Sequence, residues 1–151
     1  MEIKEHQEFK IDHLFSFRGT VSQNELPAIT NDMKEKIAAE GAEVKGLPIS
    51  TTYSMQGGKA DMEILIPVDK EIQDAENYKY KPVLKIANAL TAYYKGNPSD
   101  IGQVYNAINQ YIADNSLQPI TTAYSVVTNV DPFAPANSET YVYVGINPNI
   151  I

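Results

Sequence analysis

The sequence predicts an α+β protein built from two similar modules, each with the order strand, helix, strand, strand. Three observations support this prediction. Two seven-residue stretches nearly repeat each other, Pro48–Ser54 (PISTTYS) and Pro119–Ser125 (PITTAYS). An apolar stretch with helical spacing precedes each copy, and a strand-like stretch follows it. An echo whose flanks also follow one plan indicates a duplicated module.

The first module begins with residues 14–19 (LFSFRG), an extended apolar run that closes on a basic residue and a glycine. The next apolar residues recur every three or four positions, which places them on one helix face: Leu26, Ile29, Met33 and Ile37. Gly41 follows as a residue suited to the left-handed end of a helix. Residues 62–68 (MEILIPV) read as the closing strand.

The second module repeats this order. Residues 90–96 (LTAYYKG) again end on a basic residue and a glycine, and residues 140–146 (TYVYVGI) read as the closing strand. One helix face is formed by Ile101, Val104, Ile108 and Ile112. Ser99 is expected to cap this helix, with Asp100 in its electropositive first turn.

We expect one domain made of two repeats, about 9–68 and 83–146, joined by the charged linker 69–79. A half of about 70 residues buries only a small core, and one helix covers only one face of a sheet. The predicted fold is therefore an antiparallel sheet with two helices on one face and a cleft on the other.

Composition excludes several classes. The formal net charge is −7, which argues against a nucleic-acid partner because such binding needs a basic face. No apolar run has membrane length, and with two His, no Cys and no metal-binding spacing, we expect neither metal nor cofactor. His6 and His13 read as exposed or partly packed polar residues. The expectation is a cytoplasmic bacterial protein without a membrane partner.

The two halves differ in chemistry although they share a plan. Residues 1–77 hold fifteen acidic and eight basic residues, whereas residues 78–151 hold four of each. Nine of the ten tyrosines lie in residues 78–151. Tyrosine is a common strand residue, so each one alone is unremarkable, but as a set they indicate a surface that presents aromatic hydroxyls.

Strand alternation places part of this set on one face. Glu139, Tyr141 and Tyr143 point one way, while Val142 and Val144 point towards the expected helix-covered core.

The corresponding face of the first half carries Asp61, Glu63 and Leu65, and Tyr53 and Tyr124 occupy matching positions on neighbouring strands. Tyrosines with isolated carboxylates suit a flat, apolar, neutral or cationic small molecule. The alternative is that the carboxylates are solvated charges at strand edges. The candidate ligand-binding residues are Tyr53, Glu63, Tyr93, Tyr124, Glu139, Tyr141 and Tyr143; no catalytic residue is assigned.

Residues 83–105, Ala123–Ser125 and the closing strand 141–146 resemble the GyrI-like small-molecule-binding domain. That fold also forms the effector-binding part of multidrug-responsive transcription regulators and occurs as a stand-alone protein. The resemblance covers nearly the whole chain through loose motifs in a common order. It implies duplicated strand-helix-strand-strand modules around a central cleft.

The resemblance also implies a pocket acid in the last strand, four residues before the position of Gly145, which meets cationic ligands. Tyr141 holds that position here, which makes a neutral or polar aromatic ligand credible. Glu63, four residues before Pro67, keeps an acid in the first half, and Glu139 lies on the same predicted face as Tyr141. Either glutamate is a candidate replacement for the usual acid.

Three functions follow, in order of preference. The first is binding or sequestering of an aromatic small molecule, cationic or neutral, without catalysis. The second is a hydrolase of small electrophiles, as some GyrI-like proteins are described, which would use a pocket Glu of raised pKa beside a Tyr hydroxyl. The third is a protein-interaction or inhibitor module that docks a protein partner, or a second copy in a homodimer, on the same face. No Ser-His-Asp or Cys-His arrangement is present.

Overall fold

The structure is a computed structural model that describes residues 1–151 and contains six strands and two α-helices. The chain forms two compact units. Residues 10–84 make up the N-terminal unit, and residues 1–9 with 85–151 make up the C-terminal unit. Each unit is described by itself below.

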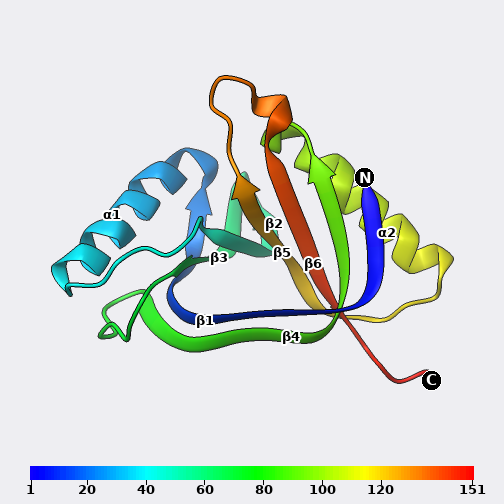
Figure 1. Ribbon diagram of the computed structural model, residues 1–151, viewed down its shortest axis with the longest axis horizontal. Helices are drawn as coiled ribbons and strands as arrows, with labels where there is room; N and C mark the ends of the chain where they lie inside the picture. Colours follow the sequence, from blue (N-terminus) through cyan, green and yellow to red (C-terminus); the bar gives the residue numbers. More distant parts are fainter. The chain divides into compact units, whose positions relative to one another are not determined.

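The N-terminal unit contains most of the first long strand, a helix and a hairpin (Figure 1). Its elements are β1 (Glu2–Ser22), which enters the unit at residue 10, α1 (Leu26–Ala39), β2 (Ile49–Gln56), β3 (Lys59–Pro67) and the start of β4 (Tyr78–Lys95). Both β1 and β2 pair antiparallel with β3. The strand order β1–β3–β2 therefore makes β3 the central strand of this unit.

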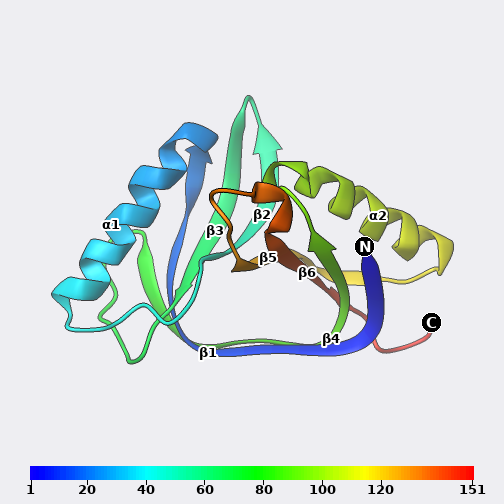
Figure 2. The ribbon, with the colours of Figure 1, turned by 45° about the horizontal axis from the view of Figure 1, so that its top comes forward.

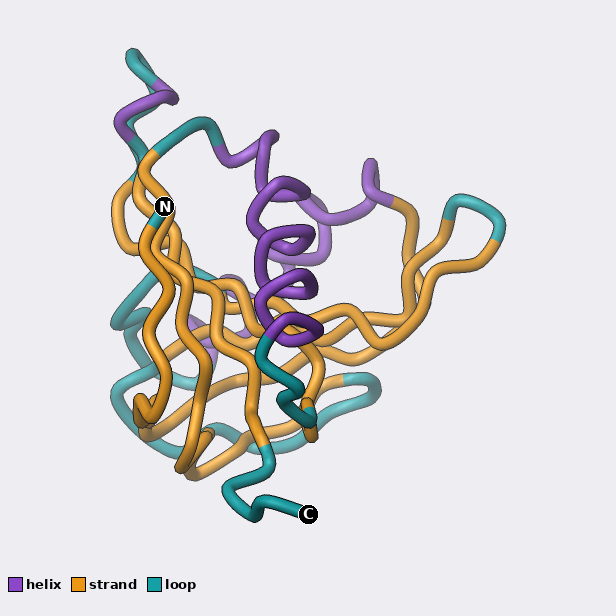
Figure 3. The backbone as a smooth tube through the Cα atoms, turned by 90° about the vertical axis from the view of Figure 1, so that its right-hand side faces the viewer, coloured by secondary structure: helices purple, strands orange, loops and turns teal.

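The C-terminal unit has the same plan. Its elements are the remainder of β4, α2 (Ile101–Asp114), β5 (Pro119–Asn129) and β6 (Glu139–Ile146), with the first residues of β1. Both β4 and β5 pair antiparallel with β6, so the order is β4–β6–β5 with β6 in the centre. Figure 3 shows the helices in purple among the orange strands. The expected α+β class and antiparallel pairing are confirmed; duplication as the origin of the shared plan remains a prediction.

The strands β1 and β4 are longer than the apolar runs at residues 14–19 and 90–96 suggest. From residue 2 to residue 9 the side chains of β1 alternate between exposed and partly or fully buried. This period-two pattern is typical of a half-buried strand even where few residues are large and apolar. Within the predicted linker 69–79, Ile72 and Tyr78 are buried in the core of the N-terminal unit.

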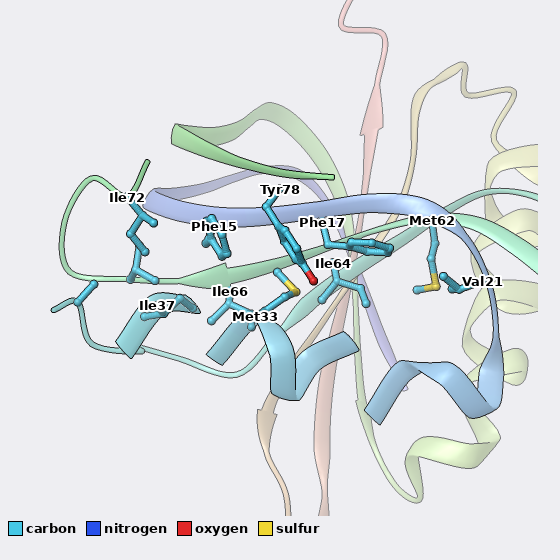
Figure 4. Close-up of a cluster of buried hydrophobic side chains, with 12 residues drawn as sticks. Phe15, Phe17, Val21, Met33, Ile37, Met62, Ile64, Ile66, Ile72 and Tyr78 are labelled. Atoms are coloured by element: carbon cyan, nitrogen blue, oxygen red, sulfur yellow. The ribbon is translucent and has the colours of Figure 1, made fainter. Parts of the chain in front are cut away.

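Strand alternation separates a core face from a polar face in the N-terminal unit. In this unit α1 lies beside β1 and β3 (Figure 2). Met33 and Ile37 of α1 pack among Phe15, Ile64 and Ile66 of these strands (Figure 4). Burying one such side chain contributes about 1.5–3 kcal/mol. The residues between them on β1 and β3 therefore point to the other face.

The C-terminal unit has a corresponding core. Val104 and Ile108 of α2 pack against Leu90 of β4 and against Val142 and Val144 of β6. The prediction that these two valines face the helix-covered core is confirmed. All five residues are at most 5% exposed.

The helix ends partly follow the sequence signals. After α1, Gly41 has a left-handed φ of 71°, and its N–H donates to the Ala38 carbonyl at 3.0 Å, as expected for a helix-terminating glycine. Before α2, the predicted cap at Ser99 is wrong. Asn97 caps the short 3-10 helix Pro98–Asp100 that leads into α2, because its Oδ1 accepts from the Ser99 N–H at 3.0 Å and the Ser99 hydroxyl at 2.9 Å. Asp100 is the N-cap of α2 itself and makes no side-chain cap. Neither helix combines the length and apolarity needed to cross a membrane.

The core of the C-terminal unit yields a first test. Ile108→Ala should lower the free energy of unfolding by about 2–4 kcal/mol, because it leaves a cavity at a position that is 2% exposed. Chemical denaturation measures the change. Asn109→Ala, at an exposed position of the same helix, is the control and should change it by no more than about 0.5 kcal/mol. Equal effects of the two variants would contradict the packing described.

Candidate functional site

The ladder between β4 and β6 places several polar aromatic residues on the face turned away from α2. Tyr93 lies opposite Tyr141, and Thr91 lies opposite Tyr143. Residues directly opposite each other in an antiparallel ladder project to the same face. The neighbours Val142 and Leu90 project to the core instead.

A cavity of about 270 Å³ opens on this face; we call it the tyrosine cavity. It is lined by Thr91, Tyr93, Tyr141 and Tyr143 and by Glu2, Lys4, Gln7 and Glu8 from the start of β1. The tyrosines form a continuous aromatic wall. The ring centroids of Tyr93 and Tyr141 are 5.0 Å apart and those of Tyr141 and Tyr143 6.2 Å apart, and Phe9 stacks on Tyr143 at 4.3 Å.

Glu139 forms a hydrogen bond with one of these tyrosines. The Tyr93 hydroxyl donates to Glu139 Oε1 at 2.5 Å. This hydrogen bond, together with burial, raises the pKa of Tyr93 to about 12. Burial, with the neighbouring Tyr141, also raises the pKa of Tyr143. Both hydroxyls are therefore neutral at physiological pH and act as hydrogen-bond donors or acceptors, not as bases.

One lining atom lacks a partner. The hydroxyl oxygen of Thr91 is buried and makes no hydrogen bond. Buried polar atoms are almost always paired, because leaving one unpaired costs about 1–3 kcal/mol. Thr91 lines the tyrosine cavity, but its hydroxyl oxygen is itself shielded from solvent, and the buried Thr140 hydroxyl, outside the cavity, is unpaired in the same way.

The structure brings together only part of the candidate set. Tyr93, Tyr141 and Tyr143 line the tyrosine cavity, and Glu139 is bonded to one of them. Tyr124 on β5 lies opposite Tyr143, on the same face but outside the cavity lining. The remaining two candidates, Tyr53 and Glu63, belong to the N-terminal unit.

Glu63 is the centre of a polar network in that unit. It lies on β3 and is 3% exposed. Its Oε2 accepts from the Ser16 hydroxyl at 2.5 Å and from the Lys81 ammonium, and its Oε1 accepts from the Tyr53 hydroxyl at 2.9 Å. Both carboxylate oxygens are thus engaged by the protein itself.

A β-bulge delivers Tyr53 to this network. The register of β2 against β3 shifts between Thr52 and Ser54, which makes Tyr53 the extra residue. Bulges re-aim side chains in this way. The Arg18 guanidinium carbon lies 3.8 Å from the centre of the Tyr53 ring, and the same guanidinium forms an ion pair with Asp61 at 3.1 Å.

These contacts fix the charge state of Glu63. Burial alone would raise its pKa, but the hydrogen bonds from Lys81, Ser16 and Tyr53 outweigh burial and hold the pKa below its ordinary value of 4.5. The hydrolase alternative requires a glutamate with a raised pKa beside a tyrosine. At Glu63 that expectation is wrong, because the carboxyl is ionised at neutral pH and cannot act as a proton donor there.

A second cavity, of about 360 Å³, lies over this network; we call it the Glu63 cavity. It is lined by Ser16, Arg18, Tyr53, Glu63, Ala75, Asn77, Tyr78, Lys79 and Lys81. Three of these residues, Ser16, Arg18 and Lys81, were not predicted from the sequence. The alternation in residues 14–19 could have placed the first two, since Ser16 and Arg18 occupy the positions between and after the core phenylalanines Phe15 and Phe17.

No family model matches the chain, and no curated protein does. Solved structures do. The EcmrR C-terminal domain matches with a TM-score of 0.72 and 11% identity, covering 97% of this chain and 99% of that one. EcmrR in a DNA complex matches with a TM-score of 0.76 and 17% identity over 97% of this chain. The chain spans 56% of that EcmrR chain.

Two further similar structures name a ligand or an activity. SAV2435, solved bound to tetraphenylphosphonium, has a TM-score of 0.57 and 12% identity over 97% of this chain and 93% of its own. A protein from Listeria innocua described as a hydrolase has a TM-score of 0.56 and 12% identity over 95% of this chain and 93% of its own. The chain thus has the fold of the GyrI-like small-molecule-binding domain.

The Glu63 network predicts a specific pH dependence. Because the folded pKa is lowered, the stabilisation is complete above the ordinary value of 4.5 and is lost as pH falls through the folded value. Glu63→Gln should therefore lower the free energy of unfolding by about 1–3 kcal/mol at neutral pH and by much less in acid.

Urea denaturation at neutral and at acid pH measures the free energy of unfolding of the wild type, of Glu63→Gln and of a control variant. Glu35→Gln, at an exposed position of α1, is the control and should follow the wild type at every pH. A Glu63→Gln deficit that stays constant down to acid pH would contradict the ionised network.

Proposed function

We propose that this protein binds a flat aromatic small molecule in the tyrosine cavity and does not transform it. The observation that carries the proposal is the set of three neighbouring tyrosine rings that lines the cavity. The tyrosines offer apolar ring faces, and their hydroxyls offer polar contacts. Apolar walls with a few placed polar groups are typical of small-molecule sites.

The size and charge of the cavity narrow the ligand class. At about 270 Å³ it lies just below the usual range of ligand sites, which begins at about 300 Å³, and this size suits a molecule of one or two rings. Lys4 is paired with Glu2 at 3.3 Å, so Glu8 supplies the surplus charge among the lining residues. Glu139 is not a lining residue, but it accepts a hydrogen bond from Tyr93 and adds a second acid next to the cavity. A cationic aromatic ligand fits this balance better than an anionic one.

The comparisons support the proposal at the level of the fold. SAV2435 was solved with tetraphenylphosphonium, an aromatic cation, and it shares this fold. Tyr124 extends the polar face beside Tyr143 and is proposed as a further contact for the part of a ligand that reaches beyond the cavity. A hydrolase would need a protonated glutamate beside a tyrosine. In the N-terminal unit Glu63 does not meet this need, because its carboxylate is ionised and accepts hydrogen bonds from the protein at both oxygens.

Binding can be tested with a panel of aromatic cations and their neutral analogues. A ligand at about 100 times its Kd should add roughly 2.7 kcal/mol of stability, which a thermal-shift assay detects. Tyr141→Ala should then weaken binding by about 1–3 kcal/mol, through loss of stacking and of buried aromatic area. Tyr80→Ala, which removes a tyrosine of the N-terminal unit, is the matched control and should leave affinity unchanged.

Glu139→Gln separates the ligand classes. It keeps the shape and an acceptor for the Tyr93 hydroxyl but removes the charge, so it should weaken a cation and leave a neutral aromatic unaffected. A panel without any shift, together with a stable protein complex that Tyr141→Ala disrupts, would favour the interaction module. Turnover of an electrophile that Glu139→Gln abolishes while binding survives would favour the hydrolase.

A further inference from the structure

The Glu63 cavity carries a positive charge in an acidic protein. Arg18, Lys79 and Lys81 line it together with Glu63. Arg18 is paired with Asp61 and Lys81 with Glu63, so Lys79 supplies the surplus positive charge. The whole chain has a formal net charge of −7. The local sign is therefore opposite to that of the protein, and opposite to the surplus at the tyrosine cavity.

The features that would attract a cation are already used by the protein. The ring of Tyr53 has the Arg18 guanidinium over it at 3.8 Å, and its hydroxyl is bonded to Glu63. The Glu63 carboxylate accepts from Lys81, Ser16 and Tyr53. An incoming cation would have to displace either Arg18 or Lys81 before it found a ring face or an acid.

The donors, in contrast, are not exhausted. Lys79 makes no ion pair, and the Lys81 ammonium, which has three donors, gives one hydrogen bond to Glu63. The side chains of Arg18 and Lys81 are 55% and 40% exposed, so both reach solvent within the cavity. Arg18 uses Nε and one terminal nitrogen on Asp61, which leaves further N–H groups free.

We propose that the Glu63 cavity is a second binding site, selective for a small molecule that carries an anionic oxygen group, a carboxylate or a phosphate. Lys79 and the free donors of Arg18 and Lys81 bind the anion. Glu63 holds Lys81 in place and does not touch the ligand charge. This site differs from the tyrosine cavity in its residues and in the charge of the ligand that it binds. An experiment can therefore support one proposal and contradict the other.

The test compares benzoate with benzamide, which has the same shape without the charge, and adds inorganic phosphate as a third probe. Two-dimensional NMR of the full chain shows which N–H signals shift when each probe is added. Benzoate should shift the Arg18 Nε–H signal and the backbone amides of residues 77–81, and benzamide should not. The shifts should shrink as ionic strength rises, because exposed charge contacts are screened.

Two variants sharpen the assignment. Lys79→Met should weaken benzoate by roughly fivefold, the equivalent of about 1 kcal/mol for an exposed charge contact. Lys34→Met makes the same charge change at an exposed position of α1 and should have no effect. Arg18→Gln should also weaken benzoate, because it removes the guanidinium N–H groups that Asp61 does not use and leaves Asp61 without its cation.

Equal binding of benzamide and benzoate, equal loss in the two lysine variants, or shifts confined to the tyrosine cavity would each overturn the proposal. Phosphate shifts that also depend on Lys79 would support it and identify a general oxyanion site. Benzoate shifts without phosphate shifts would support it and identify a carboxylate site. Tyr141→Ala should leave all of these shifts unchanged, which keeps the result independent of the tyrosine cavity.

Discussion

The alternation of side chains along the two central strands, β3 and β6, is the constraint on which the rest of the structure depends. Each strand sends every second residue to a helix and the others to the opposite face. A shift of one residue in register would exchange the two sets completely. Burial of Ile64 and Ile66 against α1 therefore fixes Glu63 and Leu65 on the far side, and burial of Val142 and Val144 does the same for Tyr141 and Tyr143. The faces that carry the two cavities are a direct consequence of core packing.

The same constraint gives both units an acid–tyrosine pair with different surroundings. In the ladders, Arg18 lies opposite Glu63, and Lys95 lies opposite Glu139. When the halves are aligned on their basic-glycine pairs, Glu63 therefore corresponds to Glu139 and not to Tyr141. Each acid accepts from a tyrosine hydroxyl. Only Glu63 also accepts a hydrogen bond from a lysine, Lys81, and this difference gives the two cavities different electrostatic character.

The class of fold and the helix-facing residues could be predicted from the sequence because they depend on local periodicity. Contacts that join distant segments could not. Ser16 and Lys81 meet Glu63 from 47 and 18 residues away. The bulge at Tyr53 has no signal in the sequence, because the PISTTYS echo predicts equal geometry in both halves, yet only the first copy has its tyrosine at a bulge. The choice of Asn97 over Ser99 as a cap depended on where the turn starts, which helix periodicity leaves open by a few residues.

Specificity in such a fold depends on whether the protein or the ligand supplies the cation. A cation over a tyrosine ring is worth about 0.5–2 kcal/mol, and a hydrogen bond to a charged group about 1.5–3 kcal/mol. In the N-terminal unit Arg18 and Lys81 already make both interactions, so a cationic ligand that displaced them would gain little beyond what the protein lost. In the C-terminal unit no basic side chain lies over the rings of Tyr141 and Tyr143, and the same interactions remain to be made by a ligand. The placement of two basic side chains thus distinguishes the two cavities of this fold, without any change in its strand order.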